Sequence, residues 1–163
     1  MILGGKERDF VVHDDNNVKG FFDQYRWLSN FHKAPVYYEG MLYPSTENAY
    51  QAAKTDDYDK RFQFSIVEPS KAKILSKELI EPDDWINRKY DIMFMLCYDK
   101  FYRHKDLREL LLQTEGKYLE ETNWWSCTYW GVCNGVGENN LGRILMDIRR
   151  LIRKNPAYKG FSI

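Results

Sequence analysis

The sequence has few cysteines and no long apolar run. The three cysteines, Cys97, Cys127 and Cys133, are an odd number, and none lies with a histidine at the paired spacing of a zinc site. We therefore expect no disulfide framework, no bound metal and no cofactor. No apolar stretch approaches the length of a membrane span, and the first ten residues carry charges where a signal peptide needs an apolar segment. These absences predict a soluble, cytoplasmic protein with no membrane partner.

Net charge is also lacking, because 24 Lys and Arg balance 24 Asp and Glu. Bulk attraction to nucleic acid is therefore not indicated, and any contact with a polyanion must come from a local patch. The 163 residues contain no repeat, low-complexity tract or long linker. A chain of this length buries enough surface to fold without a disulfide or metal. We predict a single domain over residues 1–163.

Aromatic residues are abundant, at 16% of the chain with five Trp and twelve Tyr. Some must form the core, but Tyr and Trp also keep a polar tip that suits a pocket stacking on a base or a sugar. Composition alone does not separate the two roles.

The apolar pattern predicts an α+β fold, mainly α-helical, with a few short strands. Residues 1–18 read as irregular, with a turn at 14–17. Strands are predicted at 19–25 and 34–43, the latter turning at 39–40, with Val36, Tyr38 and Leu42 on its inner face. Helices are predicted from Ser45, at 69–80, from 83 or 84, at 106–113 and at 141–153. The inward positions of the last helix are Leu141, Ile144, Leu145, Ile148, Leu151 and Ile152.

Glu47, Gln51 and Lys54 share one face of the helix that begins after Ser45, because they stand at i, i+4 and i+7. Glu47 lies in the first turn, where the helix dipole favours an anion, so we expect an ionised carboxylate acting as a base or an electrostatic stabiliser. On spacing alone, the commoner alternative is a Glu that decorates a helix start and a solvated Lys.

The segment 129–142 is rich in glycine and runs into the last predicted helix. Gly135 and Gly137 allow positive φ, so the loop can be read as a phosphate cradle at a helix N-terminus. It lacks the third glycine of a dinucleotide fingerprint and the Gly-Lys-Ser/Thr of a P-loop. The alternative is an ordinary turn capped by Asn139 or Asn140.

Two further segments combine polar and aromatic residues. Ser29 and Asn30 could orient a sugar hydroxyl or a base edge, and the nearby Arg26 could bind a phosphate. Trp85, in a first helical turn, could stack on a flat ligand. Equally, Ser29-Asn30 could be a turn and Trp85 a core residue.

Taken together and in order, these segments resemble the NADAR family, also called the YbiA-like family. The resemblance rests on Leu-Ser-Asn-Phe (28–31), Tyr-Pro-Ser-Thr-Glu-Asn-Ala-Tyr-Gln-Ala-Ala-Lys (43–54), Asp-Trp (84–85), residues 119–121, Tyr-Trp-Gly (129–131) and Gly-Glu-Asn-Asn-Leu-Gly (137–142). It covers about residues 20–153 and implies an N-glycosidase. Such enzymes hydrolyse the N-glycosidic bond of ribosylamino pyrimidine intermediates of riboflavin synthesis, or of ADP-ribose attached to guanine in nucleic acid.

The resemblance also implies site residues. By position in the family's motifs, Glu47 and Lys54 are the predicted catalytic residues. The predicted substrate-binding residues are Arg26, Ser29, Asn30, Phe31, Trp85, Trp130, Gly131 and Asn139. Gln51 is expected to support them.

Glycoside cleavage leaves positive charge at C1′, which a nearby carboxylate such as Glu47 would stabilise. Lys54 could attack C1′ to give a Schiff base, or stay charged and bind phosphate or the leaving base. One departure bears on the substrate: Cys127 stands where related sequences usually carry Asp. This change and the aromatics at 124–130 favour ADP-ribosylated guanine in DNA or RNA as the substrate over a small ribosylated nucleotide. The alternative to an enzyme is a non-catalytic protein that binds ADP-ribose or a nucleotide.

Overall fold

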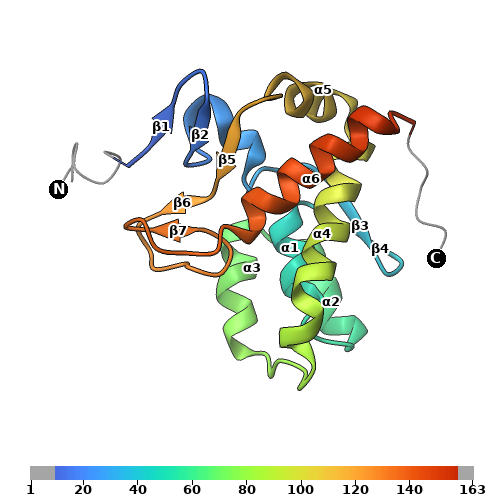
Figure 1. The fold of residues 1–163 in the computed structure, drawn as a ribbon. Coiled ribbons are helices and arrows are strands. Elements are labelled where there is room, and N and C mark those ends of the chain that lie inside the picture. The colour runs from blue at the N-terminus through green and yellow to red at the C-terminus, as the bar shows by residue number, and fades with distance from the viewer. Residues whose placement is uncertain (1–9, 158–163) are drawn as a thin grey trace.

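The structure is a computed structural model that describes residues 10–157, and helices make up its centre (Figure 1). The α-helices of this part are α1 (Thr46–Ala52), α2 (Tyr58–Ser65), α3 (Pro69–Leu75), α4 (Trp85–Arg103), α5 (Lys105–Gln113) and α6 (Asn140–Lys154). Two 3-10 helices, η1 (Asp23–Leu28) and η2 (Ser76–Glu78), join them. None of the helices in this part is long and apolar enough to cross a membrane.

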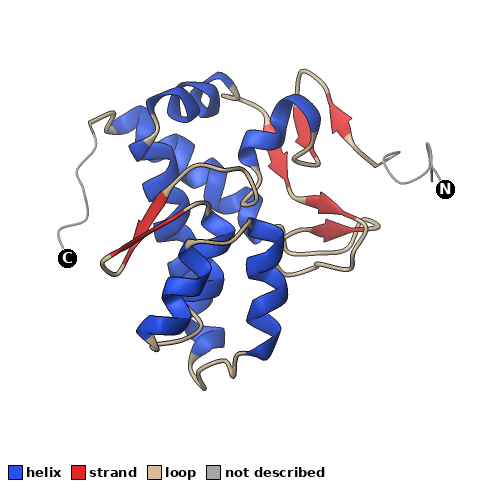
Figure 2. Cartoon of the chain, turned by 180° about the vertical axis from the view of Figure 1, so that it is seen from behind, coloured by secondary structure: helices blue, strands red, loops and turns tan. Residues whose placement is uncertain are grey.

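The strands are short and form three small sheets. They are β1 (Val12–His13), β2 (Asn17–Lys19), β3 (Val36–Tyr38), β4 (Met41–Tyr43), β5 (Tyr118–Glu120), β6 (Thr122–Asn123) and β7 (Val132–Cys133). β2 pairs antiparallel with β1 and parallel with β5, β3 pairs antiparallel with β4, and β6 pairs parallel with β7. Figure 2 shows the β3–β4 hairpin on one side of the helices and the other two sheets on the opposite side. The predicted α+β class, mainly helical with a few short strands, is confirmed.

The core lies along α4 and α6, which contact each other near the middle of the molecule (Figure 1). Ile144, Leu145, Ile148 and Ile152 of α6 are fully buried, as the helical spacing predicts. Leu151 was expected to face inward as well, but it is 36% exposed. At 100° per residue it falls at the margin of the apolar stripe, which explains the error.

The hairpin shows a similar error of one position. Val36 pairs with Tyr43 and both are buried, whereas Tyr37 pairs with Leu42 and both are exposed. Leu42 therefore lies on the outer face, because the turn at Glu39-Gly40 shifts the alternation by one residue.

Several elements differ from the sequence prediction. The strand expected at 19–25 is wrong: β2 ends at Lys19, Gly20 has a φ of +87°, and η1 begins at Asp23. A positive φ at Gly20 breaks the extended backbone that a strand requires. β1, β2 and α2 were missed, and of residues 1–18 the first nine lie outside the described range. The helix predicted at 69–80 is α3 followed by η2.

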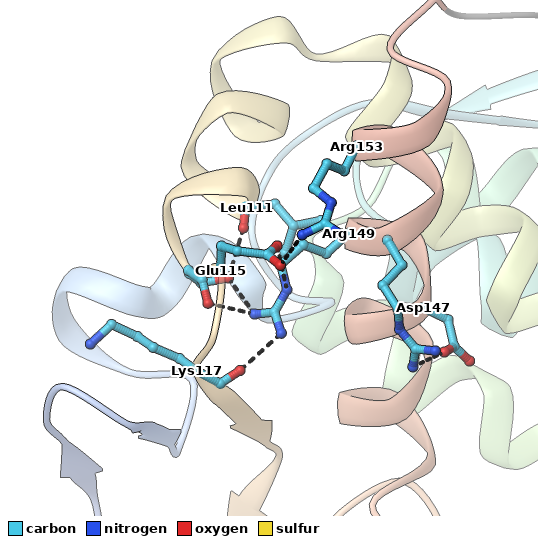
Figure 3. A network of polar contacts seen from close by, with 8 residues as sticks. Leu111, Glu115, Lys117, Asp147, Arg149 and Arg153 are labelled. Atoms are coloured by element: carbon cyan, nitrogen blue, oxygen red, sulfur yellow. Dashed lines mark hydrogen bonds and ion pairs between the residues drawn. The ribbon is translucent and has the colours of Figure 1, made fainter.

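A buried arginine ties α6 to the turn before β5 (Figure 3). Nη1 of Arg149 donates to the carbonyl oxygen of Thr114 at 2.6 Å and to its Oγ1 at 2.8 Å, and Nη2 donates to the carbonyl oxygen of Lys117 at 2.9 Å. Arg153 of the same helix pairs with Glu115 at 2.6 Å. These contacts fix where β5 starts, and β5 leads directly into the cavity described next.

Candidate active site

Two adjoining cavities open where α1, the segment after η1, the β5–β6 junction and residues 125–130 meet. The first lobe has a volume of about 260 Å³ and contains Glu47 and Lys54 in its lining. The second lobe, of about 270 Å³, contains Arg26 and Phe22. The lobes share a border formed by Ser29, Phe31, Lys73, Glu121 and Trp125. A ligand in one lobe can therefore extend into the other.

Helix α1 places Glu47 in the first lobe. Its N-cap is Ser45, as the sequence predicts, with Oγ accepting from the N–H of Asn48 at 3.2 Å. Asn48 in turn donates to the carbonyl oxygens of Phe64 and Val67 at 2.8 Å each, which anchors the helix against the end of α2. Every residue of α1 is buried, so its polar side chains have little access to solvent.

The Glu47 carboxyl is 6% exposed and accepts a hydrogen bond from Nε2 of Gln51 at 2.8 Å. Burial raises the pKa of Glu47 above its ordinary value, against the opposing effects of the Gln51 hydrogen bond and the charges of Lys73 and Lys54. Burial therefore acts against the ionised form that the sequence predicts for Glu47, and the ionised state stays a prediction. A first-turn dipole is a modest effect, and loss of hydration opposes it in a fully buried helix.

Lys54 follows α1 and also lines the first lobe. Its Nζ forms an ion pair with Glu81 at 2.7 Å and lies 5.7 Å from the ring centres of both Tyr50 and Trp85. An amine attacks carbon only when its lone pair is free of a proton. The geometry thus presents Lys54 as a paired cation, and a nucleophilic role would require the Glu81 contact to break.

The segment after η1 carries three more of the predicted residues into the cavity. Ser29 and Phe31 line both lobes and Asn30 lines the first. Asn30 is held by Met93, whose Sδ accepts a hydrogen bond from Nδ2 of Asn30 at 3.4 Å. The buried Lys100 holds the segment by donating from Nζ to the carbonyl oxygens of Trp27 at 2.7 Å and Ser29 at 3.0 Å.

Two cations lie over Phe31 in the second lobe. The guanidinium carbon of Arg26 is 6.0 Å and Nζ of Lys73 is 5.6 Å from its ring centre. Within residues 10–157 neither cation forms an ion pair or a hydrogen bond from its side chain. Both charges are thus available to an anionic ligand.

Three predicted binding residues do not line either lobe. Trp130 is in the lining, but Trp85 is 4% exposed and packs behind it against Tyr50, with ring centres 5.3 Å apart. Gly131 and Asn139 also lie outside the lining. The direct ligand contacts predicted for these residues stay predictions.

Asn139 and Gly131 hold the β5–β6 junction. Oδ1 of Asn139 accepts from the N–H of Glu121 at 3.0 Å, and its Nδ2 donates to the carbonyl oxygen of Leu119 at 2.9 Å. A Cβ on Gly131 would stand 2.1 Å from the carbonyl oxygen of Glu121, so only glycine fits there.

The start of α6 decides between the two interpretations of the glycine-rich loop. The N–H groups of Asn139, Asn140 and Leu141 donate to carbonyl oxygens at residues 131, 129 and 130. Donors already engaged in this way are not free to hold a phosphate, so the loop is a structural turn and not a phosphate cradle.

Glu121 is the main residue that sequence reasoning missed. It lines both lobes, its Oε2 is buried and has no hydrogen-bond partner within the described chain, and burial raises its pKa to about 7. Lys73 and Trp125, which also line both lobes, were missed too. Residues 119–121 belong to the segments that carry the family resemblance, but nothing in them singles out Glu121, which lies between two short strands. The acidic pair 120–121, directly after the buried Leu119, is the signal that could have found it.

Cys127, which stands where related sequences usually carry Asp, lines the first lobe. Its backbone N–H donates to Oδ1 of Asn123 at 3.0 Å and its carbonyl oxygen accepts from Nδ2 of the same side chain at 2.8 Å. Among the described residues no cluster of His, Cys, Asp and Glu has an arrangement that could hold a metal ion.

Comparison with known proteins adds the following. The family model described as the NADAR domain matches residues 12–153. The N-glycosidase YbiA of Shigella flexneri serotype 5b is 34% identical over 132 residues, which cover 78% of this chain and 81% of the relative. The riboflavin biosynthesis protein VVA0006 of Vibrio vulnificus is 30% identical over 142 residues, 83% of this chain but only 38% of that longer protein. The NMR structure of the Escherichia coli protein YbiA superposes with a TM-score of 0.76 at 29% identity, covering 96% of this chain and 97% of that one.

Proposed function

The chain belongs to the NADAR family, and from this premise we propose that it is an N-glycosidase that removes ADP-ribose from ADP-ribosylated guanine in nucleic acid. The observation that carries the proposal is a buried carboxyl, Glu47, facing a two-lobed cavity whose walls combine aromatic rings with unpaired cations.

Glu47 fits the reaction because cleavage of an N-glycosidic bond leaves positive charge on the sugar at C1′. A buried carboxylate such as that of Glu47 stabilises a nearby positive charge more than it would in bulk solvent. The charge at C1′ also favours the ionised form of Glu47 at the moment it is needed. Gln51, bonded to Oε1, fixes the direction in which the carboxyl points.

The second lobe supports a substrate that is larger than a ribosylamino pyrimidine phosphate. Arg26 and Lys73 offer two unpaired cations for a diphosphate, and Phe22 and Trp125 provide flat apolar walls beside them. With the scissile bond at the border of the two lobes, next to Glu47, an ADP-ribosyl group places its diphosphate and adenine in the second lobe. The smaller substrate ends at its phosphate and leaves those aromatic walls unfilled.

Trp130, which the sequence predicted as a binding residue, and Trp125, which it missed, are the two tryptophans in the cavity lining on which a base could stack. Trp125 is 43% exposed at the border of the two lobes, and Trp130 meets Tyr50 edge to face with ring centres 5.6 Å apart. Stacking of a base on an exposed aromatic contributes about 1–3 kcal/mol in complexes with single-stranded nucleic acid. A guanine held this way needs no base-specific hydrogen bonds.

The test is to incubate the purified protein with an ADP-ribosylated guanine oligonucleotide and, separately, with a ribosylamino pyrimidine phosphate, and to follow release by chromatography. We expect release from the oligonucleotide and its loss in Glu47→Gln, with ligand binding retained. Cleavage of the pyrimidine substrate alone would show that the substrate choice is wrong and would favour the role that the name of the Vibrio relative describes. Binding of ADP-ribose with no release from either substrate would identify a non-catalytic reader.

A further inference from the structure

The backbone of Glu121, at the junction of β5 and β6, is held by contacts from other segments of the chain. Its N–H donates to Oδ1 of Asn139, and its carbonyl oxygen accepts from the N–H of Val132 at 2.9 Å. Gly131 lets the neighbouring backbone pack directly against that carbonyl oxygen. These contacts fix the position of the Glu121 backbone, and they come from two segments, residues 131–132 and residue 139.

The carboxyl that this backbone positions has no partner in the protein. Its Oε2 is buried without a hydrogen bond, while the group lines both lobes at their shared border. A buried carboxyl oxygen left unpaired is costly, and such a group in a cavity is satisfied when a ligand brings the matching donor or acceptor. The bond to be cleaved lies at this border if the substrate spans both lobes.

Four effects set the protonation of Glu121. Burial, the largest, raises its pKa, and the negative charge of Glu47 raises it further, whereas the charges of Arg26 and Lys73 lower it. The pKa of about 7 that results leaves a large fraction of the group protonated near neutral pH. A carboxylic acid whose pKa lies near the working pH is well suited to give up a proton and take it back.

Resting on the proposed N-glycosidase function, we propose that Glu121 is the second catalytic carboxyl, which protonates the leaving nitrogen from its buried Oε2 while Glu47 stabilises C1′. As the C1′–N bond breaks, its electron pair goes to nitrogen, and nitrogen takes the proton of Glu121. Water then adds to C1′ and returns a proton to the Glu121 carboxylate. The products are the free amine or base and a sugar with a hydroxyl at C1′, so no other reactant is needed.

Glu121→Gln removes the proton while keeping the shape of the side chain. We expect kcat to fall by about 100-fold or more, in line with the usual contribution of a general acid, with product binding little changed. The control is Glu120→Gln, since the neighbouring carboxyl, which accepts from Oγ1 of Thr122 at 2.6 Å, lines neither lobe. We expect this variant to keep wild-type kcat.

A substrate whose leaving group needs no proton separates a proton donor from a residue that only shapes the cavity. On a 4-nitrophenyl riboside 5′-phosphate, Glu121→Gln should recover most of the wild-type rate, whereas Glu47→Gln should stay slow. Equal losses of Glu121→Gln on both kinds of substrate would overturn the assignment, and so would an unchanged kcat on the natural bond.

The pH profile of the wild-type enzyme tests the same assignment without any substitution. The acid must hold its proton, so kcat should fall as the pH rises through about 7. A kcat that stays flat from pH 6 to pH 8.5 would contradict the role of Glu121 even if the variant failed to fold. Absence of release by the wild-type protein from either substrate would instead refute the N-glycosidase function itself, so the two failures can be told apart.

Discussion

Lys100, a buried lysine beneath the cavity, gives the fold a stability that depends on pH. It is 1% exposed on α4, and burial lowers its pKa from 10.5 to about 8, with the charge of Arg26 acting in the same direction and Cys97 opposing. Its ammonium has no carboxylate partner and is held by the two carbonyl oxygens of Trp27 and Ser29. The perturbation we consider is Lys100→Met, which keeps the length of the side chain and removes the charge.

The magnitude follows from linkage between protonation and folding. The unfolded chain binds the proton more tightly than the folded one, so folding works against the charged form below pH 8, and stability rises as the pH increases from 8 toward 10.5. At about 1.36 kcal/mol per pKa unit, the charge lowers the free energy of unfolding by roughly 3 kcal/mol at pH 7 and by roughly 1 kcal/mol at pH 10.

The substitution relieves that penalty but removes a donor from the carbonyl oxygens of Trp27 and Ser29, at a cost of about 1–3 kcal/mol. The Ser29 oxygen keeps the hydrogen bond from the N–H of His32 at 3.1 Å. At pH 7 Lys100→Met should therefore be at least as stable as the wild type. Between pH 7 and pH 10 the wild type should gain about 2 kcal/mol relative to the variant, because only the wild type loses a proton.

Urea unfolding followed by tryptophan fluorescence at pH 7, 8, 9 and 10 measures this difference. The matched control is Lys105→Met, at an exposed lysine on α5 whose side chain is 79% accessible. Its difference from the wild type should not vary with pH, since an exposed ammonium has similar surroundings in the folded and unfolded chain. A wild-type minus Lys100→Met difference that stays constant from pH 7 to pH 10 would refute the reasoning.

Three other substitutions test how the cavity walls are held. Ser45→Ala removes the N-cap of α1 and should lower the free energy of unfolding by about 1 kcal/mol, measured by urea unfolding. Arg149→Met removes the donors to the carbonyl oxygens of Thr114 and Lys117, of which that of Thr114 keeps the N–H of Lys117 at 2.9 Å, and should lower the free energy of unfolding by about 1–3 kcal/mol; Arg150→Met on the exposed side of the same helix should change it little. Gly131→Ala forces a Cβ against the carbonyl oxygen of Glu121 and should cost about 3 kcal/mol or more, together with a loss of glycosidase activity, so a stable and fully active variant would contradict the contact.

The α-helices other than α2 could be predicted from the sequence because their signals are local. The cap at Ser45, the start of α4 after Asp84 and the apolar stripe of α6 are each read within a few residues. β2 and β5 are different, since they are three residues each and pair across a separation of about 100 residues. Such strands are defined by the partner that pairs with them, and the alternation in so short a segment is too weak to predict them.

Some of the site residues could likewise be predicted from local sequence, and others could not. The spacing predicted Glu47 and Lys54 on one helix face, whereas α1 ends at Ala52 and Lys54 follows it; the structure still puts both side chains in the first lobe. The pKa direction of Glu47 did not follow, because it depends on how completely other elements cover α1. Glu121 could not be found from spacing, since only the packed loop at 131 and 139 directs it into the cavity.

The positions of the Glu47 and Glu121 carboxyls bear on the effect of having a cysteine at position 127. Glu47 and Glu121 already share the first lobe, and the negative charge of Glu47 is among the causes that raise the pKa of Glu121. A third carboxylate at 127 would add like charge to this pair, hold both protons more tightly and oppose an incoming phosphate. Cys127 puts no third carboxylate beside this pair, which leaves Arg26 and Lys73 to attract an anion. The departure at 127 therefore fits a cavity in which one carboxyl gives a proton, the other stabilises C1′, and the cations are left for a diphosphate.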